Sequence, residues 1–305
     1  MLKKYDFCDE KLTECENDNA TVLVYYRPDE KEKRYLVEEL KLDEHTLNSA
    51  LDPDELSRLE FEPDHMALIF KRPKTYAEKD NFLFKVYSVG LFVFKDRLVI
   101  MEADETPLFE GKMFNRIQSL QELVIKLLYR TVFRFTENLK SINNVSGALE
   151  QQINTSMRNA YLIDMFTLEK SLTYYLNAIN SNGVVMEKLK LNSSKLSLSR
   201  ENLELLDDLM IENTQCYRQA KIYSDILSSM MDARVSIVSN NLNLLIKTLT
   251  IITIGIMIPT FVVSAFSMNV AIPLARDNPI SFWIILIMAA ASLASVVLYS
   301  WYRKW

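Results

Sequence analysis

Hydrophobic and polar positions change their spacing twice along the chain, and each change predicts a different kind of structure. Short apolar runs of the β type occur at 21–26, 65–70, 82–94 and 97–101, with turn-forming residues between them. The intervening segments 42–51 and 52–62 are typical of short helices, the second with Asp52 or Asp54 near its N-terminus. We therefore expect an α/β domain over residues 1–114.

Beyond residue 114 the apolar positions recur at helical spacing, which predicts a first helix. A second helix is expected from Gln151 to Ile179, ending at a turn that contains Gly183. The two segments predict an antiparallel helical pair over residues 115–183. The stripe that begins the first helix comprises Ile117, Leu120, Val124 and Leu127.

Residues 184–254 contain neither glycine nor proline, which favours an uninterrupted helix. Ser199 is a candidate N-cap, so the helix is expected to run from Arg200 into the apolar segment that follows, with Pro259 at most kinking it. At 1.5 Å per residue such a helix is on the order of 100 Å long, and only about 30 Å fits within a bilayer. We expect residues 184–247 to form a cytosolic stalk.

Two uncharged apolar segments, 248–268 and 280–301, are each long enough to cross a membrane as a helix. They predict a hairpin with an outer loop over 269–279. Arg303 and Lys304 lie in the tail 302–305, whereas Arg276 is the only cation of the loop, so positive-inside bias favours cytoplasmic termini. The first residues lack the apolar core of a signal peptide, so the first 240 residues are expected to stay in the cytosol.

One face of the long helix carries mostly small polar or acidic residues, repeating at alternating steps of three and four. Within the predicted first span, hydroxyl and amide groups at this spacing indicate a face that avoids lipid and either packs on partner helices or lines water. In the stalk, the alternative is the solvated side of an amphipathic helix. Because the same spacing continues from the stalk into the apolar segment that follows it, we expect a symmetric oligomer around an aqueous pore. The face comprises Ser264, Thr260, Met257, Thr253, Thr250, Ile246, Asn243, Ser239, Ser236, Asp232, Ser229, Asp225, Ile222, Arg218, Gln215, Ile211 and Asp208.

Individual positions on this face suggest roles in conduction. Asp225 and Asp232 are expected to make acidic rings that favour cations. Leu249 and Met257 lie near the face, where rings of apolar side chains exclude water; their alternative role is helix packing. Asn269 ends the first span, and a ring of neutral amide oxygens suits hydrated Mg²⁺, which gives up its water reluctantly.

Composition excludes several other function classes. The net charge is −5 and basic clusters with interleaved aromatic residues are absent, so nucleic acid is not an expected partner. Five scattered glycines form no phosphate-binding loop, and GxSxG and HExxH motifs are missing, so we expect neither an enzyme nor an organic cofactor. Three cysteines without a CxxC pair predict free thiols, and both histidines, His45 and His65, are expected to be structural.

The chain resembles the CorA family of magnesium channels, whose signature is Gly-Met-Asn at the end of the first of two C-terminal spans. Here residues 267–269 read Ser-Met-Asn. The resemblance implies an α+β membrane protein with a cytosolic α/β N-terminal domain, a long stalk helix and two C-terminal transmembrane helices, assembled as a funnel-shaped homopentamer. The cell inner (plasma) membrane is the expected location, because it suits a chain in which we find no targeting sequence. By the same resemblance, Met268 and Asn269 belong to the selectivity ring, Asn243 to an inner ring, and Leu249 and Met257 to constrictions.

The resemblance also implies closure by cytosolic Mg²⁺ at acidic sites. Asp208 falls where the family's stalk carries one such carboxylate, and Glu78 and Asp80 are candidates for its partner on a neighbouring subunit. Mg²⁺ would then be both the transported and the regulatory ion.

The departure from the signature is Ser267, whose Cβ is expected to narrow the mouth, shift Asn269 or add a ring of hydroxyl groups. We therefore weigh three hypotheses: a potential-driven Mg²⁺ channel with Co²⁺ and Ni²⁺ as candidate further ions, a Zn²⁺-transporting relative, and a non-conducting membrane sensor or scaffold. Ser267 supports the third. The absence of histidine and of cysteine other than Cys216 from the pore-forming helix disfavours the second.

Overall fold

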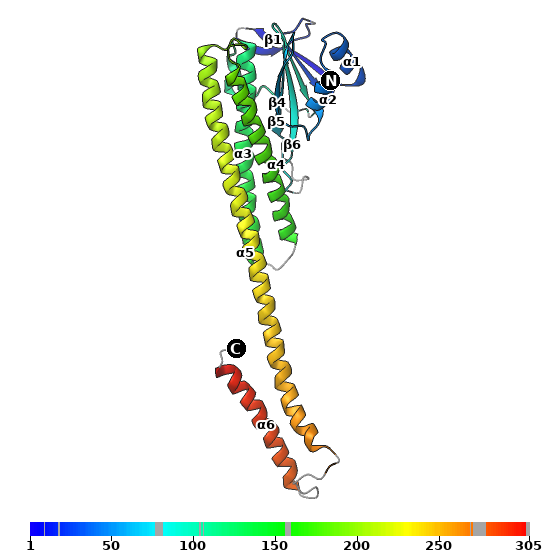
Figure 1. Cartoon of the computed structure of the whole chain (residues 1–305), viewed down its shortest axis with the longest axis vertical. Helices are drawn as coiled ribbons and strands as arrows, with labels where there is room; N and C mark the ends of the chain where they lie inside the picture. Colours follow the sequence, from blue (N-terminus) through cyan, green and yellow to red (C-terminus); the bar gives the residue numbers. More distant parts are fainter. Residues whose placement is uncertain are drawn as a thin grey trace. The chain divides into compact units, whose positions relative to one another are not determined.

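The structure is a computed structural model and describes residues 1–8, 10–17, 19–76, 82–103, 105, 107–155, 160–268, 270 and 279–302 (Figure 1). The chain divides into two compact units, Met1–Met231 and Asp232–Trp305. The long helix α5 contributes to both of them, and each unit is described by itself.

A seven-stranded sheet forms the centre of the first unit. Its order is β2-β1-β3-β7-β6-β5-β4, and every neighbouring pair is antiparallel except β3 and β7, which are parallel. The strands are β1 (Leu2–Cys8), β2 (Lys11–Glu14), β3 (Val22–Tyr26), β4 (Arg58–Phe61), β5 (Met66–Pro73), β6 (Val86–Val93) and β7 (Leu98–Glu102).

The central strands are apolar on both faces because helices cover both. Leu23 and Tyr25 of β3 pack in a core with α1 (Glu30–Glu38) and α2 (Glu44–Leu51). Val22 and Val24 of the same strand pack in a larger core with α3 (Leu120–Thr155) and α4 (Ala160–Leu191). The four predicted β runs correspond to β3, β5, β6 and β7, which confirms them.

The approach of α2 to the sheet depends on a glycine. A Cβ at Gly90 of β6 would lie 2.5 Å from the Cβ of Ala50 on α2. Real side chains do not pack at that separation, so only glycine lets α2 sit this close to the strand.

The predicted helix over 52–62 is wrong. Residues 58–61 form the edge strand β4, in which Arg58 pairs with Ile69 and Phe61 with Met66 of β5. Leu59 points into the core while its neighbours are more exposed. Backbone bonds along the open edge of β5, together with this alternate burial, outweigh the local helical preference of the segment. The helix expected at 42–51 is confirmed by α2.

The predicted helix end at Gly183 is also wrong, because α4 continues through this residue to Leu191. The amide of Asn182 bonds both the N–H and the C=O of Lys71 on β5, at 2.8 Å each. A Cβ at Gly183 would lie 2.9 Å from the Nδ2 of Asn213 on α5. Glycine here permits close helix packing rather than ending a helix.

A buried ion pair lies within the sheet. Arg72 of β5 donates from Nη1 to Oε1 of Glu102 on β7 at 2.5 Å, and both side chains are almost fully buried. The hydroxyl of Tyr87 on β6 donates to the same oxygen at 2.5 Å. Three neighbouring strands are therefore joined through one carboxylate.

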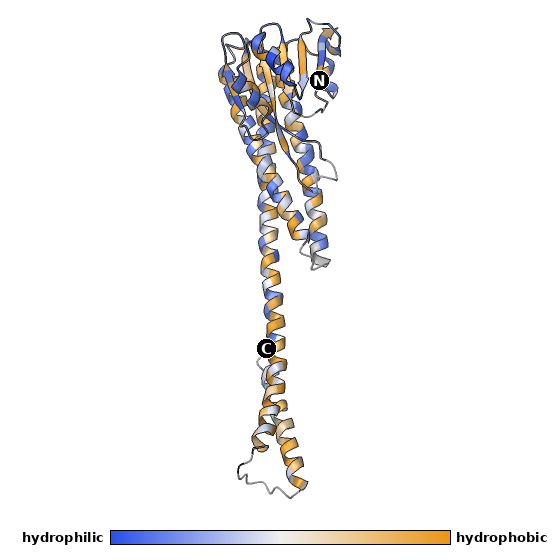
Figure 2. Cartoon of the chain, turned by 90° about the vertical axis from the view of Figure 1, so that its right-hand side faces the viewer, coloured by the Kyte–Doolittle hydropathy of each residue, from blue (hydrophilic) through white to orange (hydrophobic). Residues whose placement is uncertain are grey.

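The uninterrupted helix predicted from Arg200 is confirmed by α5 (Arg200–Phe266), which contains Pro259. Ser199 caps it, because its Oγ accepts from the N–H of Asn202 at 3.1 Å. The last helix, α6, spans Pro279–Tyr302. Both α5 and α6 contain stretches long and apolar enough to cross a membrane, visible as the orange parts of these helices in Figure 2.

Candidate pore face

Within the first unit, the polar face of α5 points away from the core. Its residues from Asp208 to Ser229 are all exposed. Most of them follow a buried residue by two positions, as Gln215 follows Asn213 and Arg218 follows Cys216. Two positions correspond to about 200° around a helix. The face is therefore opposite the side that packs on the rest of this unit.

The acidic positions on this face differ in their partners. Asp225 accepts from the Nζ of Lys221, one turn earlier, at 2.8 Å, and this bond raises the pKa of the lysine. Within the described ranges, Asp208 has no ion pair, whereas the adjacent Asp207 pairs with Lys190 at 2.8 Å. The charge of Asp225 is thus compensated within one chain. The spacing of four residues between Lys221 and Asp225 is the sequence signal from which this ion pair could have been predicted.

In the second unit, the hydroxyl groups on this face are bonded to their own helix. Thr250 and Thr253 each donate from Oγ1 to the carbonyl four residues earlier, at 2.8 Å. Thr260 does the same at 2.7 Å. Because the single hydroxyl proton is used in this way, each oxygen offers only lone pairs to its surroundings.

The helix α6 packs on a different side of α5. A Cβ at Gly255 would meet Cδ1 of Leu293 on α6 at 3.7 Å, which is ordinary contact. Thr253 and Met257 lie two positions on either side of Gly255, about 200° around the helix from it. Asn243, Ile246, Leu249 and Ser264 are exposed as well. The candidate pore face is therefore not covered by α6.

The end of α5 gives Ser267 a specific role. Its Oγ donates to the carbonyl of Ser264 at 2.8 Å, and its N–H donates to the same carbonyl at 3.1 Å. Positive φ at described non-glycine residues occurs at Glu10, Arg27, Lys41, Phe82 and Ser197, but not here. Ser267 thus needs none of the backbone freedom of glycine, and its hydroxyl satisfies a carbonyl of the last turn.

Three predicted site residues, Asn269, Glu78 and Asp80, lie outside the described residues. Met268 is exposed. Among the residues that the structure does describe, no group of three or more His, Cys, Asp or Glu side chains is placed to hold a metal ion.

Cys216 lies on the buried side of α5, which is opposite the candidate face within the first unit. All three cysteines are free, as expected, and burial raises the pKa of the Cys216 thiol to about 11. His65 packs against Phe92 and Phe94.

Comparison with known proteins identifies relatives along almost the whole chain. A family described as CorA-like Mg²⁺ transporter protein matches residues 19–303. The cobalt/magnesium transport protein CorA of Methanocaldococcus jannaschii is 24% identical over 272 residues, which cover 86% of this chain and 83% of that protein.

Two solved structures share the fold. The complete CorA magnesium transporter from Methanocaldococcus jannaschii superposes with a TM-score of 0.82 at 18% identity, covering 98% of this chain and 96% of that one. The full-length CmaX protein superposes with a TM-score of 0.73 at 15% identity, covering 100% of this chain and 98% of that one.

Proposed function

Because the chain belongs to the CorA-like Mg²⁺ transporter family, and is therefore a divalent-cation transporter of the membrane, we propose that it is a channel through which Mg²⁺ enters the cytosol. The observation that carries this proposal is the polar face of α5, which keeps one helical phase and is covered neither by the core of the first unit nor by α6. The membrane potential supplies about 2.3 kcal/mol per charge per 100 mV, and a divalent ion doubles it.

Hydrated Mg²⁺ suits the chemistry of this face. Mg²⁺ holds its water tightly, so the moving species presents outward-pointing water hydrogens. Those hydrogens need acceptors, and Thr250, Thr253 and Thr260 offer only oxygen lone pairs. An ion that keeps its shell can therefore pass by exchanging hydrogen bonds, without removal of its water.

A homopentamer, as the family resemblance implies, would bring five copies of this face around one axis. The channel would lie in the inner (plasma) membrane of the cell, with both termini of each chain in the cytoplasm. Ser267, Met268 and Asn269 then form the outer selectivity ring, Asn243 the inner ring, and Leu249 and Met257 the constrictions. Ile246, Thr250, Thr253, Thr260 and Ser264 line the lumen between them. Asp232 supplies a more open negative charge than Asp225, which already pairs with Lys221.

Asp208 is proposed as a carboxylate that senses cytosolic Mg²⁺. Loss of one charged contact of about 1–2 kcal/mol changes an affinity by roughly tenfold. Asp208→Ala should therefore raise by roughly tenfold the internal Mg²⁺ concentration that half-inhibits flux into liposomes. Glu212→Ala, which removes another exposed acid of α5 outside this face, is the control. Equal inhibition of both variants and the native protein would remove Asp208 from the sensor.

The proposed function is tested by Mg²⁺ entry into liposomes that hold the purified protein, a trapped Mg²⁺ dye and an inside-negative potential. We expect flux in the native protein and a change of less than about threefold in Ser267→Gly, because the hydroxyl is bonded to its own helix and the backbone is not strained. Silence in the native protein with flux in Ser267→Gly would support the non-conducting scaffold instead. External Co²⁺, Ni²⁺ and Zn²⁺ then rank the permeant ions.

A further inference from the structure

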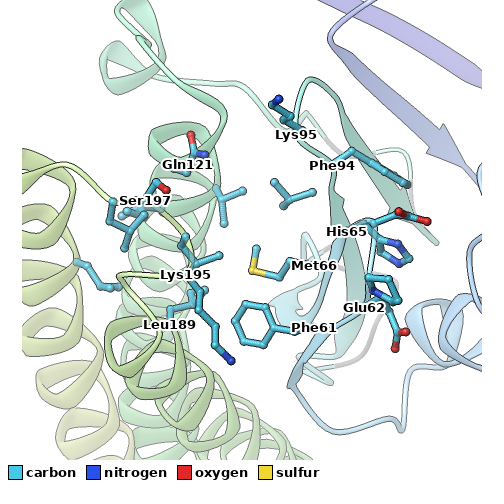
Figure 3. Close-up of a pocket in the computed structure, with 18 residues that line it drawn as sticks. Phe61, Glu62, His65, Met66, Phe94, Lys95, Gln121, Leu189, Lys195 and Ser197 are labelled. Carbon is cyan, nitrogen blue, oxygen red and sulfur yellow. The ribbon is translucent and has the colours of Figure 1, made fainter.

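A cavity of about 310 Å³ lies within the first unit, between the edge of the sheet and the helices (Figure 3). Its walls come from the β4–β5 turn, the β6–β7 turn, the start of α3, the end of α4 and the loop between α4 and α5. This volume is at the lower end of the range of about 300–1,000 Å³ that is usual for small-molecule sites. The cavity therefore has room for a compact ligand.

The inner wall of the cavity is apolar and well packed. Met66 of β5, Val124 of α3 and Leu206 of α5 are buried side chains that line it. Leu196 and Leu198 add apolar surface from the loop. An apolar wall of this kind favours a ligand with an aliphatic or aromatic body.

Two lysines stand at the rim. Lys195 extends from the α4–α5 loop, and its Nζ lies 5.3 Å from the ring centroid of Phe61 on β4. Lys95 lies on the β6–β7 turn, at the upper side of the view in Figure 3. Neither lysine forms an ion pair with any residue that the structure describes. Both are therefore able to bind a carboxylate.

The remaining charged groups are on the β4–β5 turn. Glu62 and Asp64 both precede His65 in the sequence, and Figure 3 shows Glu62 directed away from the helices that form the opposite wall. Burial lowers the pKa of His65, against the smaller opposite effect of Glu62 and Asp64, and so favours the neutral ring. Among the residues described as lining the cavity, Lys95 and Lys195 carry the permanent positive charges.

We propose that this cavity binds a small organic anion with an apolar body and one carboxylate, the body against the buried wall and the carboxylate at Lys195. The cation–π contact with Phe61, another lining residue, already restrains the Lys195 side chain, which reduces the entropy that it loses on binding. The ligand touches the sheet edge and the beginning of α5 together, because Leu206 belongs to α5.

Calorimetric titration of the full chain in nanodiscs tests this proposal, with phenylbutyrate as the probe and empty nanodiscs as the reference. We expect saturable binding of phenylbutyrate, and about tenfold weaker binding of its neutral amide and of the amine of the same length, since a charged contact contributes about 1.4 kcal/mol or more. Equal affinity for the three probes, or no saturable binding of the acid, would overturn the proposal.

Variants locate the site. Lys195→Gln should weaken phenylbutyrate binding by about tenfold. Lys170→Gln is the matched control, because Lys170 also lies over a ring, 5.7 Å from Tyr174, but not at this cavity. Leu196→Trp changes a half-buried loop residue and should fill the cavity and abolish binding. Native affinity in either Lys195→Gln or Leu196→Trp contradicts the assignment.

Discussion

Glu102→Gln is expected to lower the free energy of unfolding of the first unit by about 3–5 kcal/mol, the usual cost of removing one partner of a buried ion pair. The substitution keeps an acceptor for the hydroxyl of Tyr87 but removes the charge that compensates Arg72. Arg134 lies close enough that the charge of Arg72 contributes, after burial, to lowering its pKa. The uncompensated charge of Arg72 would therefore face a second guanidinium in a buried setting.

Amide hydrogen exchange on β6 and β7 is the suitable measurement for this variant. All three tryptophans (Trp283, Trp301 and Trp305) belong to the second unit, so their fluorescence does not report on the sheet. Arg72→Met combined with Glu102→Leu should recover most of the loss, because well-packed apolar residues can replace a buried pair. A loss below about 1 kcal/mol in Glu102→Gln, or a double variant that is no better, would contradict this account.

A cationic methanethiosulfonate reagent is expected to abolish Mg²⁺ flux through Thr253→Cys and to leave Ile252→Cys unaffected. A fixed positive charge on the proposed lumen face repels a divalent cation in a narrow, poorly screened space. The residue one position earlier is rotated by about 100° and faces away from the axis. The same contrast is expected between Thr250→Cys or Met257→Cys and Ile251→Cys.

The native cysteines set the background for this experiment. Cys8 is exposed and Cys15 is half-buried, so both are replaced by serine. Cys216 can stay, because burial raises the pKa of its thiol to about 11 and leaves it inaccessible and protonated. Liposome flux is measured before and after treatment. Equal block of Thr253→Cys and Ile252→Cys would show that this face does not line the path of the ion.

The predictable parts of the fold are those in which local pattern and tertiary environment agree. The central strands are predicted correctly because helices cover both of their faces, so they are continuous apolar runs. The hairpin of β1 and β2 escapes prediction because β1 is only half-buried, the edge strand β2 is mostly exposed, and both carry charged residues. Asn182 and Gly183 resemble a turn locally, but their contacts with β5 and α5 are tertiary.

The candidate functional residues also include some that the sequence reveals and some that only the tertiary structure reveals. The phase of the polar face is visible in the sequence because it depends on one regular helix. The cavity near Lys195 is not visible in the sequence, because its walls come from segments between β4 and the beginning of α5 that only the tertiary fold brings together. The consequence of Ser267 also needed the structure, since the hydrogen bond to Ser264 and the sign of φ decide whether a Cβ is tolerated.

The continuity of α5 has a consequence for biogenesis. Leu206, Leu227 and Met231 belong to the core of the first unit, while the same helix continues into the apolar segment that is proposed to cross the membrane. During synthesis, the core of the first unit therefore remains incomplete until the beginning of α5, up to Met231, has left the ribosome. Folding of this unit and delivery of the nascent chain to the insertion machinery must therefore overlap in time.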